Sequence, residues 1–283
     1  MIAASAVPVV FRPRGGFAQG KLFATDETII LKALERGKEE ELYRRPMGDL
    51  VAETARTFLG RPYQANTLEE RGEEQLVVNL HEFDCVTLCE SSLALARAIK
   101  LRAGGTAGYT RQLQLIRYRS GLISGYPSRL HYFSDWIADN EKKKVLEDVT
   151  KELGGERDRR PLNFMSRHRE AYPRLASEGD FAAIAAAEKN LSGVPRYVLP
   201  KGRVHGVLEK IQNGDIIAVT TSMEGLDVSH TGIAVREGGT TRLLHAPNVG
   251  HQVQISGGSL AEYLDAHEKQ TGIMVARPLE PGA

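Results

Sequence analysis

Apolar residues recur at helical spacing through the first third of the chain. They predict helices over residues 25–34 and 46–59. Residues 85–101 are apolar nearly all round, which predicts a helix buried in the core, with Asp84 as its N-cap. A further helix is predicted within residues 104–125. The first part of the chain is therefore expected to be helical.

Short runs rich in β-branched residues follow Pro200 and are separated by Gly, Asn and Ser. They predict strands, joined by tight turns into an antiparallel sheet, over residues 211–220, 230–236, 241–246, 252–255 and 273–277. The charged middle, residues 140–190, is predicted to be mostly helical, and residues 76–78 form a short strand candidate. Helices first and strands afterwards indicate the α+β class.

The length fits one large domain, which we place at residues 26–283 with a helical elaboration at about 105–200. Residues 1–25 are interpreted as a flexible tail or the remnant of a signal peptide. The apolar stretch at residues 2–11 is followed by Arg12 and Arg14, whereas a secretory signal carries its charge first. The N-terminus therefore leaves the compartment open.

The composition is that of an ordinary globular protein, 41% hydrophobic and 26% charged. Lys and Arg number 37 against 36 Asp and Glu, a balance that predicts neither nucleic acid nor an anionic membrane as partner. The apolar runs are all shorter than the roughly 18 residues that a membrane span needs. The two cysteines, Cys85 and Cys89, are too few for a disulfide framework or a zinc site of the usual spacing.

Cys85 stands at the predicted start of the buried helix. Unpaired backbone N–H groups and the helix dipole favour a thiolate at such a position. We therefore hypothesise that Cys85 is a catalytic nucleophile. The alternative is that a small residue simply packs there, which is the commoner role of a lone cysteine.

A hairpin brings two histidines together. Gly238–Gly239 suits a two-residue turn, and a turn at these glycines places His245 opposite Gly232 and His230 opposite Pro247. Side chains alternate along a strand, so both histidines share one face and lie close enough for one ring to orient the other. A register slip of one residue would separate them.

The histidine pair supplies what a nucleophilic cysteine needs, namely a base and a group that holds the base. Small Gly232 and Ala234 on the same face are expected to leave room for another element, such as a helix N-terminus, to approach. Two histidines could also bind a metal, but the chain has no HExxH motif and no clear third ligand, so no metal site is predicted.

Several motifs in order resemble a known family. The helix-start cysteine and the two histidine strands resemble the NlpC-type cysteine peptidases, which are papain-like bacterial enzymes acting on cell-wall peptides. The resemblance is closer to one branch, the N-acetylmuramoyl-L-alanine amidase-like family, whose marks stand at residues 58–63, 84–87, 128–136, 163–166, 214–217 and 225–230. The resemblance implies a papain-like core, with a buried cysteine helix packed on an antiparallel, partly barrel-like sheet.

The resemblance also implies roles for single residues. Cys85 would be the nucleophile, His230 the general base, and His245 the group that orients His230. The residues expected to line the substrate cleft or contact the ligand are Tyr63, Asp84, Arg129, His131, Tyr132 and Trp136. For the last four, packing in the core is an equally good interpretation, because an aromatic cluster is often structural.

The implied substrate is a small muropeptide of the 1,6-anhydro type, cut between the muramic lactyl group and L-alanine. No cofactor is required, the protein is expected to be a monomer, and family members are typically exported, which predicts a periplasmic or exported enzyme. The alternatives are an endopeptidase that cuts the γ-D-glutamyl–diaminopimelate bond, or a cell-wall sugar-binding module without catalysis. A redox role for Cys85 and Cys89 is weaker, because their spacing is not CxxC.

Overall fold

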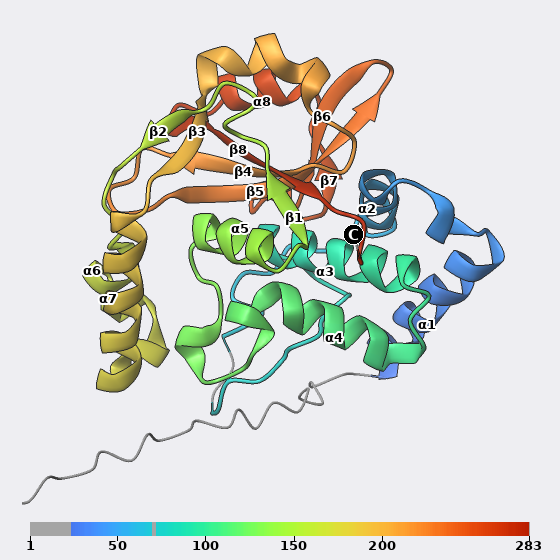
Figure 1. Cartoon of the computed structure of the whole chain (residues 1–283), viewed down its shortest axis with the longest axis horizontal. Coiled ribbons are helices and arrows are strands. Elements are labelled where there is room, and N and C mark those ends of the chain that lie inside the picture. Colours follow the sequence, from blue (N-terminus) through green and yellow to red (C-terminus); the bar gives the residue numbers. More distant parts are fainter. Residues whose placement is uncertain (1–23, 70–71, 283) are drawn as a thin grey trace, which may run out of the picture.

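The computed structural model describes residues 24–69 and 72–282 of the chain (Figure 1). Its first part is helical, as predicted, and the helices are α1 (Ala24–Glu39), α2 (Met47–Arg56), α3 (Cys85–Lys100), α4 (Gly105–Arg117) and α5 (Phe133–Lys142). Short 3₁₀ helices lie at Leu42–Arg44, Arg119–Gly121 and Tyr126–Ser128. The predicted tail lies outside the described residues up to residue 23, and its last two residues begin α1.

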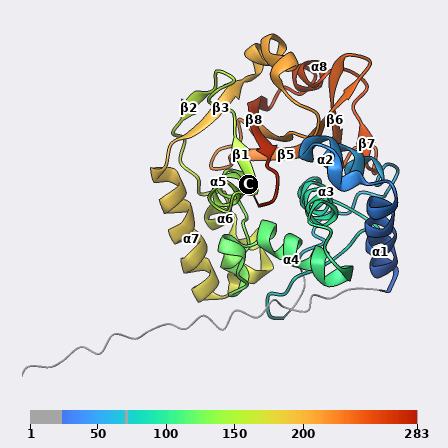
Figure 2. The same cartoon turned by 45° about the vertical axis from the view of Figure 1, so that its right-hand side comes forward.

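The middle of the chain is less helical than predicted. It contains β1 (Leu146–Asp148), β2 (Glu156–Asp158), α6 (Phe164–Arg167), 3₁₀ turns at Arg169–Ala171 and Pro173–Ala176, α7 (Glu178–Gly193) and β3 (Arg196–Pro200). The charged composition of this segment favoured a helical prediction over strands. Strand β1 pairs with the C-terminal strand β8, and β2 lies at the edge of the sheet, where charged side chains can remain in solvent. Figure 2 shows α7 standing at one end of the molecule and α1 at the other.

The remaining elements are a ten-residue 3₁₀ helix, η6 (Lys201–Lys210), then β4 (Ile216–Thr221), β5 (Val228–Glu237), β6 (Thr240–His245), β7 (Gln254–Ile255), α8 (Leu260–Asp265) and β8 (Gln270–Pro278). The strand order is β2-β3-β8-β4-β5-β6-β7, with β1 also paired to β8. Every named strand pair in the described part of the chain is antiparallel, which confirms the α+β prediction.

Two strand-level predictions were wrong. Within the described ranges no pairing joins β2 to β7, so the sheet is open rather than partly barrel-like. Residues 76–78 form no named strand; they are a buried extended segment whose Val77 carbonyl accepts a hydrogen bond from Arg117. Burial alone gave this segment the apolar pattern of a strand.

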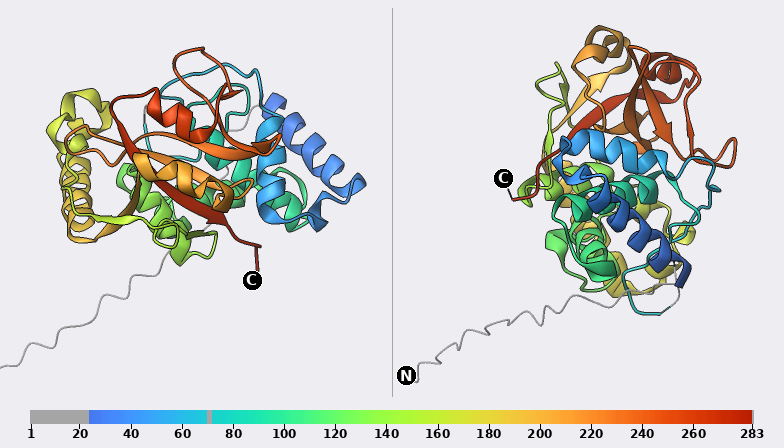
Figure 3. Two further views of the ribbon diagram at one scale, coloured as in Figure 1. Left: turned by 90° about the horizontal axis from the view of Figure 1, so that it is seen from above. Right: turned by 90° about the vertical axis from the view of Figure 1, so that its right-hand side faces the viewer.

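Helices lie on both faces of the sheet (Figures 1 and 3), and a hydrophobic cluster packs on each face. Ile233 and Leu244 face α2 and α3 on one side, whereas Ala234 and Leu243 face α8 and η6 on the other. This alternation follows from the period of two along β5 and β6. The sheet is therefore covered on both faces, and α3 runs beneath its centre.

Helix α3 is buried along its length, from Thr87 to Ile99, as its all-round apolar pattern predicts. Its one buried acid, Glu90, accepts hydrogen bonds from the guanidinium of Arg117 (Nε to Oε2, 2.7 Å) and from the indole of Trp136 (3.2 Å). These contacts fix α3 to α4 and α5. In the described part of the chain, no helix is long and apolar enough to cross a membrane.

Candidate active site

The start of α3 is fixed by a reciprocal cap. Asp84 Oδ1 accepts a hydrogen bond from the backbone N–H of Thr87 (2.7 Å), and the backbone N–H of Asp84 donates to Thr87 Oγ1 (2.9 Å). This confirms Asp84 as the N-cap and makes Cys85 the first residue of the helix. Because its carboxylate is engaged in capping, Asp84 acts on the site mainly as a fixed negative charge beside the thiol.

The Cys85 residue keeps some exposed surface. Burial of its sulfur, followed by the negative charge of Asp84, raises the pKa of the thiol to about 11. Desolvation and the neighbouring carboxylate thus oppose the thiolate-favouring effect of the helix start, and the nucleophilic role of Cys85 stays a prediction. Cys85 is therefore a neutral thiol at neutral pH.

The hairpin has the predicted register, with Ile233 paired to Leu244 and Ala234 to Leu243. At its open end, His230 Nε2 lies 2.8 Å from His245 Nδ1, a hydrogen bond in which one ring donates and the other accepts. The rings meet nearly at right angles, 80° apart. The two rings therefore lie within hydrogen-bonding distance, as the register predicts, and the role of His245 in orienting His230 stays a prediction.

Both histidines are neutral near pH 7. Burial, with smaller contributions from His245 and His267, lowers the pKa of His230 to about 3. Burial and His267 lower the pKa of His245 to about 4. An uncharged imidazole has a free lone pair, which is what a general base requires.

The face of the hairpin that carries Gly232 and Ala234 receives other elements, since Ala234 packs with residues of α8 and η6. A Cβ at Gly232 would lie 2.7 Å from Leu243 Cδ1 of the neighbouring strand. Helix α3 lies against the other face, where the hydroxyl of Thr231 donates a hydrogen bond to the Cys85 carbonyl (2.7 Å). The described atoms show no hydrogen bond between the Cys85 thiol and either histidine.

A cavity of about 420 Å³ opens beside the histidine pair. Its described lining is made mainly of hydroxyl, amide and imidazole side chains, and it includes Ser229, His230, His245, Asn248, Gln254, Ser256, Tyr263, His267 and Gln270. No Asp or Glu is present in this described lining. The cavity can therefore offer many hydrogen bonds but no carboxylate.

Tyr263 on α8 is a site residue that the sequence reasoning missed. Its ring meets His245 edge-on at 5.1 Å between centroids and lies 6.3 Å from His230. Burial raises the pKa of the Tyr263 phenol, and the charge of an ionised Cys85 raises it further, which places Tyr263 within electrostatic range of the thiol. The Ser259–Glu262 capping box could have signalled this short helix.

Comparison with known proteins identifies the family. The family model described as N-acetylmuramoyl-L-alanine amidase-like (AmiA-like) matches residues 53–273. The chain belongs to this family. A crystal structure of an N-acetylmuramoyl-L-alanine amidase from Bacteroides uniformis is 39% identical, with a TM-score of 0.79, and the match covers 82% of this chain and 99% of that one.

Two further solved structures are similar. A Bacteroides fragilis protein proposed to be a xylanase is 41% identical, with a TM-score of 0.76 and coverage of 80% of this chain and 99% of that one. A Legionella pneumophila protein shares the fold at 21% identity and a TM-score of 0.68, covering 90% of this chain and 95% of that one. None of the curated proteins matches the chain.

Within this amidase-like chain, Tyr63 lies next to the cysteine segment. It forms an isolated parallel bridge with Phe83, and its backbone N–H donates to the His251 carbonyl (2.9 Å). Burial raises the pKa of Tyr63, and the charges of Cys85 and Asp84 raise it further, so the phenol lies within range of both. A role for Tyr63 in the substrate cleft stays a prediction.

The family motif at residues 128–136 is engaged inside the protein. Arg129 is 6% exposed and binds Glu69 (2.7 Å) and the Leu68 carbonyl (2.8 Å). His131 Nε2 lies 2.9 Å from the Tyr126 carbonyl, and burial together with Arg129 lowers its pKa to about 3. These contacts hold neighbouring segments together.

Tyr132 and Trp136 complete this motif. The Tyr132 hydroxyl donates to Glu188 (2.6 Å) and accepts from the backbone N–H of Met165 (3.1 Å). Trp136 has 0% of its surface exposed, so it cannot contact a ligand in this structure. The burial of Trp136, Tyr132 and Arg129 favours the packing interpretation of these residues, and a ligand contact for them stays a prediction.

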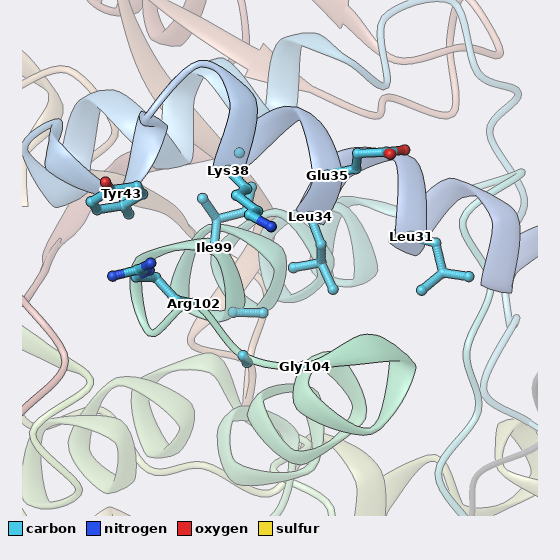
Figure 4. Close-up of a pocket in the computed structure, with 11 residues that line it drawn as sticks. Leu31, Leu34, Glu35, Lys38, Tyr43, Ile99, Arg102 and Gly104 are labelled. Atoms are coloured by element: carbon cyan, nitrogen blue, oxygen red, sulfur yellow. The ribbon is translucent and has the colours of Figure 1, made fainter.

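A larger cavity, of about 600 Å³, lies away from the candidate site between α1, the turn after it, and the ends of α3 and α4 (Figure 4). Leu34, Ile99 and Arg102 line it, and its described lining contains neither a cysteine nor a histidine. Size therefore does not identify the site. No group of three metal-binding side chains occurs within residues 24–69 and 72–282.

Proposed function

We propose that this amidase-like protein is a cysteine hydrolase that cuts the amide bond between the muramic lactyl group and L-alanine of a small muropeptide. The observation that carries the proposal is the 2.8 Å hydrogen bond between His230 on β5 and His245 on β6. Strand β5 also contacts Cys85 through Thr231. A papain-like, NlpC-type core, with a cysteine helix packed on an antiparallel sheet, is part of the proposal. The relative from Bacteroides uniformis, which carries the amidase name, supports the bond specificity.

The chemistry begins from a neutral thiol and a neutral imidazole. If His230 Nε2–H donates to His245 Nδ1, His230 Nδ1 keeps the lone pair that accepts the Cys85 proton. The sulfur attacks the lactyl carbonyl carbon, and the tetrahedral intermediate then expels the amine of L-alanine, which takes the proton from His230. Water, activated by the same imidazole, hydrolyses the thioester and restores the thiol.

The structure lacks a hydrogen bond between Cys85 and His230, and such contacts commonly tighten only when substrate binds. The raised pKa of Cys85, to about 11, makes proton transfer to His230 part of the attack rather than a step that precedes it. Unpaired N–H groups at the start of α3 are the proposed donors to the oxyanion. We further propose a 1,6-anhydro muropeptide as substrate and an exported or periplasmic location, both on family resemblance.

The xylanase name of one relative does not suit this cavity. Glycoside hydrolysis commonly uses two carboxyl groups flanking the bond that is cut. The described lining beside His230 and His245 contains no carboxylate. The γ-D-glutamyl–diaminopimelate endopeptidase would use the same three residues, so it is the alternative that an experiment must separate.

The separating experiment is mass analysis of products from an anhydro-muropeptide carrying a tripeptide or tetrapeptide stem. The amidase releases the intact stem peptide and a free anhydro-muramic sugar acid. The endopeptidase leaves L-alanyl-D-glutamate on the sugar. Appearance of the second pair of masses, or of cleaved sugar–sugar bonds, would overturn the proposed bond specificity.

A further inference from the structure

The second cysteine of the chain, Cys89, has a contact that the proposed mechanism does not use. Its thiol lies 3.7 Å from Thr231 Oγ1, a distance and geometry suited to an S–H donor. The same Thr231 hydroxyl donates to the carbonyl of Cys85 (2.7 Å). Three groups thus form one hydrogen-bonded series, from the Cys89 thiol through the Thr231 hydroxyl to the Cys85 carbonyl.

The direction of the hydrogen bonds in this series follows from its donors and acceptors. A threonine hydroxyl has one proton and two lone pairs, and a backbone carbonyl can only accept. The single Thr231 proton is therefore committed to the Cys85 carbonyl, while a lone pair of Thr231 accepts from Cys89. Cys89 and Thr231 are buried, at 0% and 1% exposure, so water cannot replace either partner.

The position of Thr231 explains what this hydrogen-bonded series does in the fold. Thr231 directly follows His230 on β5, and its side chain points to the face that carries α3. The strand that holds the base is therefore hydrogen-bonded to the backbone of the residue that holds the nucleophile. A shift of α3 along the sheet would lengthen this bond.

Cys89 is suited to a donor role. Burial raises the pKa of its thiol well above the ordinary range, and the charges of Cys85 and Glu90 act in the same direction. Cys89 thus keeps its proton while the mechanism removes the proton of Cys85. The four-residue spacing places the two sulfurs on one side of α3, but with different tasks.

We propose that Thr231 is a positioning residue, held in its donor orientation by Cys89, that sets the placement of Cys85 relative to His230. This inference rests on the proposed function of Cys85. It assigns no chemical step to Thr231 or Cys89, since neither needs to touch the substrate. Misplacing reacting groups by about 1 Å can cost roughly 100-fold in rate, so a contact of this kind affects turnover more than binding.

The test compares Thr231→Val with Thr241→Val. Thr241 is buried on the next strand, and its hydroxyl donates to the Leu208 carbonyl (3.2 Å), so both changes delete one buried hydroxyl bond to a carbonyl. We expect kcat for muropeptide cleavage to fall about 10- to 100-fold in Thr231→Val with little change in KM. Thr241→Val should lower the melting temperature similarly and leave kcat nearly unchanged.

Two further variants keep the outcome decisive. Thr231→Ser retains the hydroxyl and should recover most of the lost kcat. Cys89→Ala removes only the S–H donor and should lower kcat about threefold, an effect of the size of one weak hydrogen bond. It carries the test if Thr231→Val does not fold.

Equal kcat values in Thr231→Val and Thr241→Val would overturn the inference, as would an unchanged kcat in Cys89→Ala if Thr231→Val does not fold. Failure of the proposed function looks different, because Cys85→Ala would then remain active. Reaction of Cys85 with iodoacetamide adds a readout independent of substrate. Its rate should fall in Thr231→Val and not in Thr241→Val.

Discussion

Two polar, aromatic regions of this protein look alike in sequence and differ in structure. The polar groups of residues 128–136 bind partners inside the protein: Tyr132 binds Glu188 and Trp136 binds Glu90. The hairpin histidines bind each other and border a cavity of about 420 Å³. Residue type alone therefore does not mark a ligand site; what separates the two regions is whether the polar atoms already have partners inside the protein.

The strongest way to break this comparison is to remove one histidine. His245→Ala leaves His230 without its orienting partner, and we expect kcat to fall about 10²- to 10⁴-fold, the usual worth of a positioned acid–base group. Release of stem peptide from an anhydro-muropeptide measures the effect. His267→Ala is the control on the same cavity, because the His267 ring is exposed and hydrogen-bonds the Tyr263 carbonyl (2.7 Å) rather than His230 or His245. A loss as large as that in His245→Ala would contradict the assignment.

A change near residues 128–136, at Glu90, which binds Trp136, should lower the free energy of unfolding rather than turnover. Glu90→Gln leaves the buried Arg117 guanidinium without its counter-charge, and removing one partner of a buried pair costs about 3 kcal/mol or more. We expect the midpoint of urea unfolding to fall while turnover per folded molecule changes little. A normal midpoint with a large loss of kcat would move Glu90 into the catalytic machinery.

The histidine pair should also make stability depend on pH. The pKa of His230 is lowered to about 3 and that of His245 to about 4, while both titrate near 6.5 in an unfolded chain. Below that value the unfolded state takes up protons that the folded state does not, so stability falls as the pH drops.

Between pH 7 and pH 5 this loss should be on the order of 2–4 kcal/mol. Urea unfolding at several pH values measures it. The double variant His230→Gln, His245→Gln should lose this contribution and keep the smaller one from His131, whose pKa is also lowered to about 3. If the wild-type protein were equally stable at pH 5 and pH 7, the two rings would not be buried as neutral groups.

The smallest effect is expected for Tyr132→Phe. The change deletes a hydroxyl that serves Glu188 and the backbone of Met165, and should cost about 1–2 kcal/mol in the free energy of unfolding. KM for the muropeptide should stay near the wild-type value. A raised KM with unchanged stability would return Tyr132 to the ligand-binding residues and weaken the contrast between the two regions.

The parts of the site that follow local rules could be predicted from the sequence. The turn at Gly238–Gly239 determines the register that pairs His230 with His245, and the Asp84–Thr87 cap determines where α3 begins. Both depend on contacts between near neighbours in the chain. That is why a pattern of residues was sufficient to place them.

Features that depend on distant contacts could not be predicted in this way. Which face of the hairpin receives α3 depends on the packing of α8 and η6 against the other face, where Ala234 lies. The raised pKa of Cys85 depends on burial by the assembled fold, which competes with the local effect of the helix start. Tyr263 comes close to the histidines only because α8 packs back on β6 and β8.

The most direct test of cysteine catalysis is the turnover of Cys85→Ala on an anhydro-muropeptide, with Cys89→Ala measured beside it. The account predicts no stem peptide above the uncatalysed background for Cys85→Ala, with an unfolding midpoint close to that of the wild type. Cys89→Ala should retain about a third of the wild-type activity, in line with the loss of one weak hydrogen bond. Undiminished release of stem peptide by folded Cys85→Ala would contradict the account.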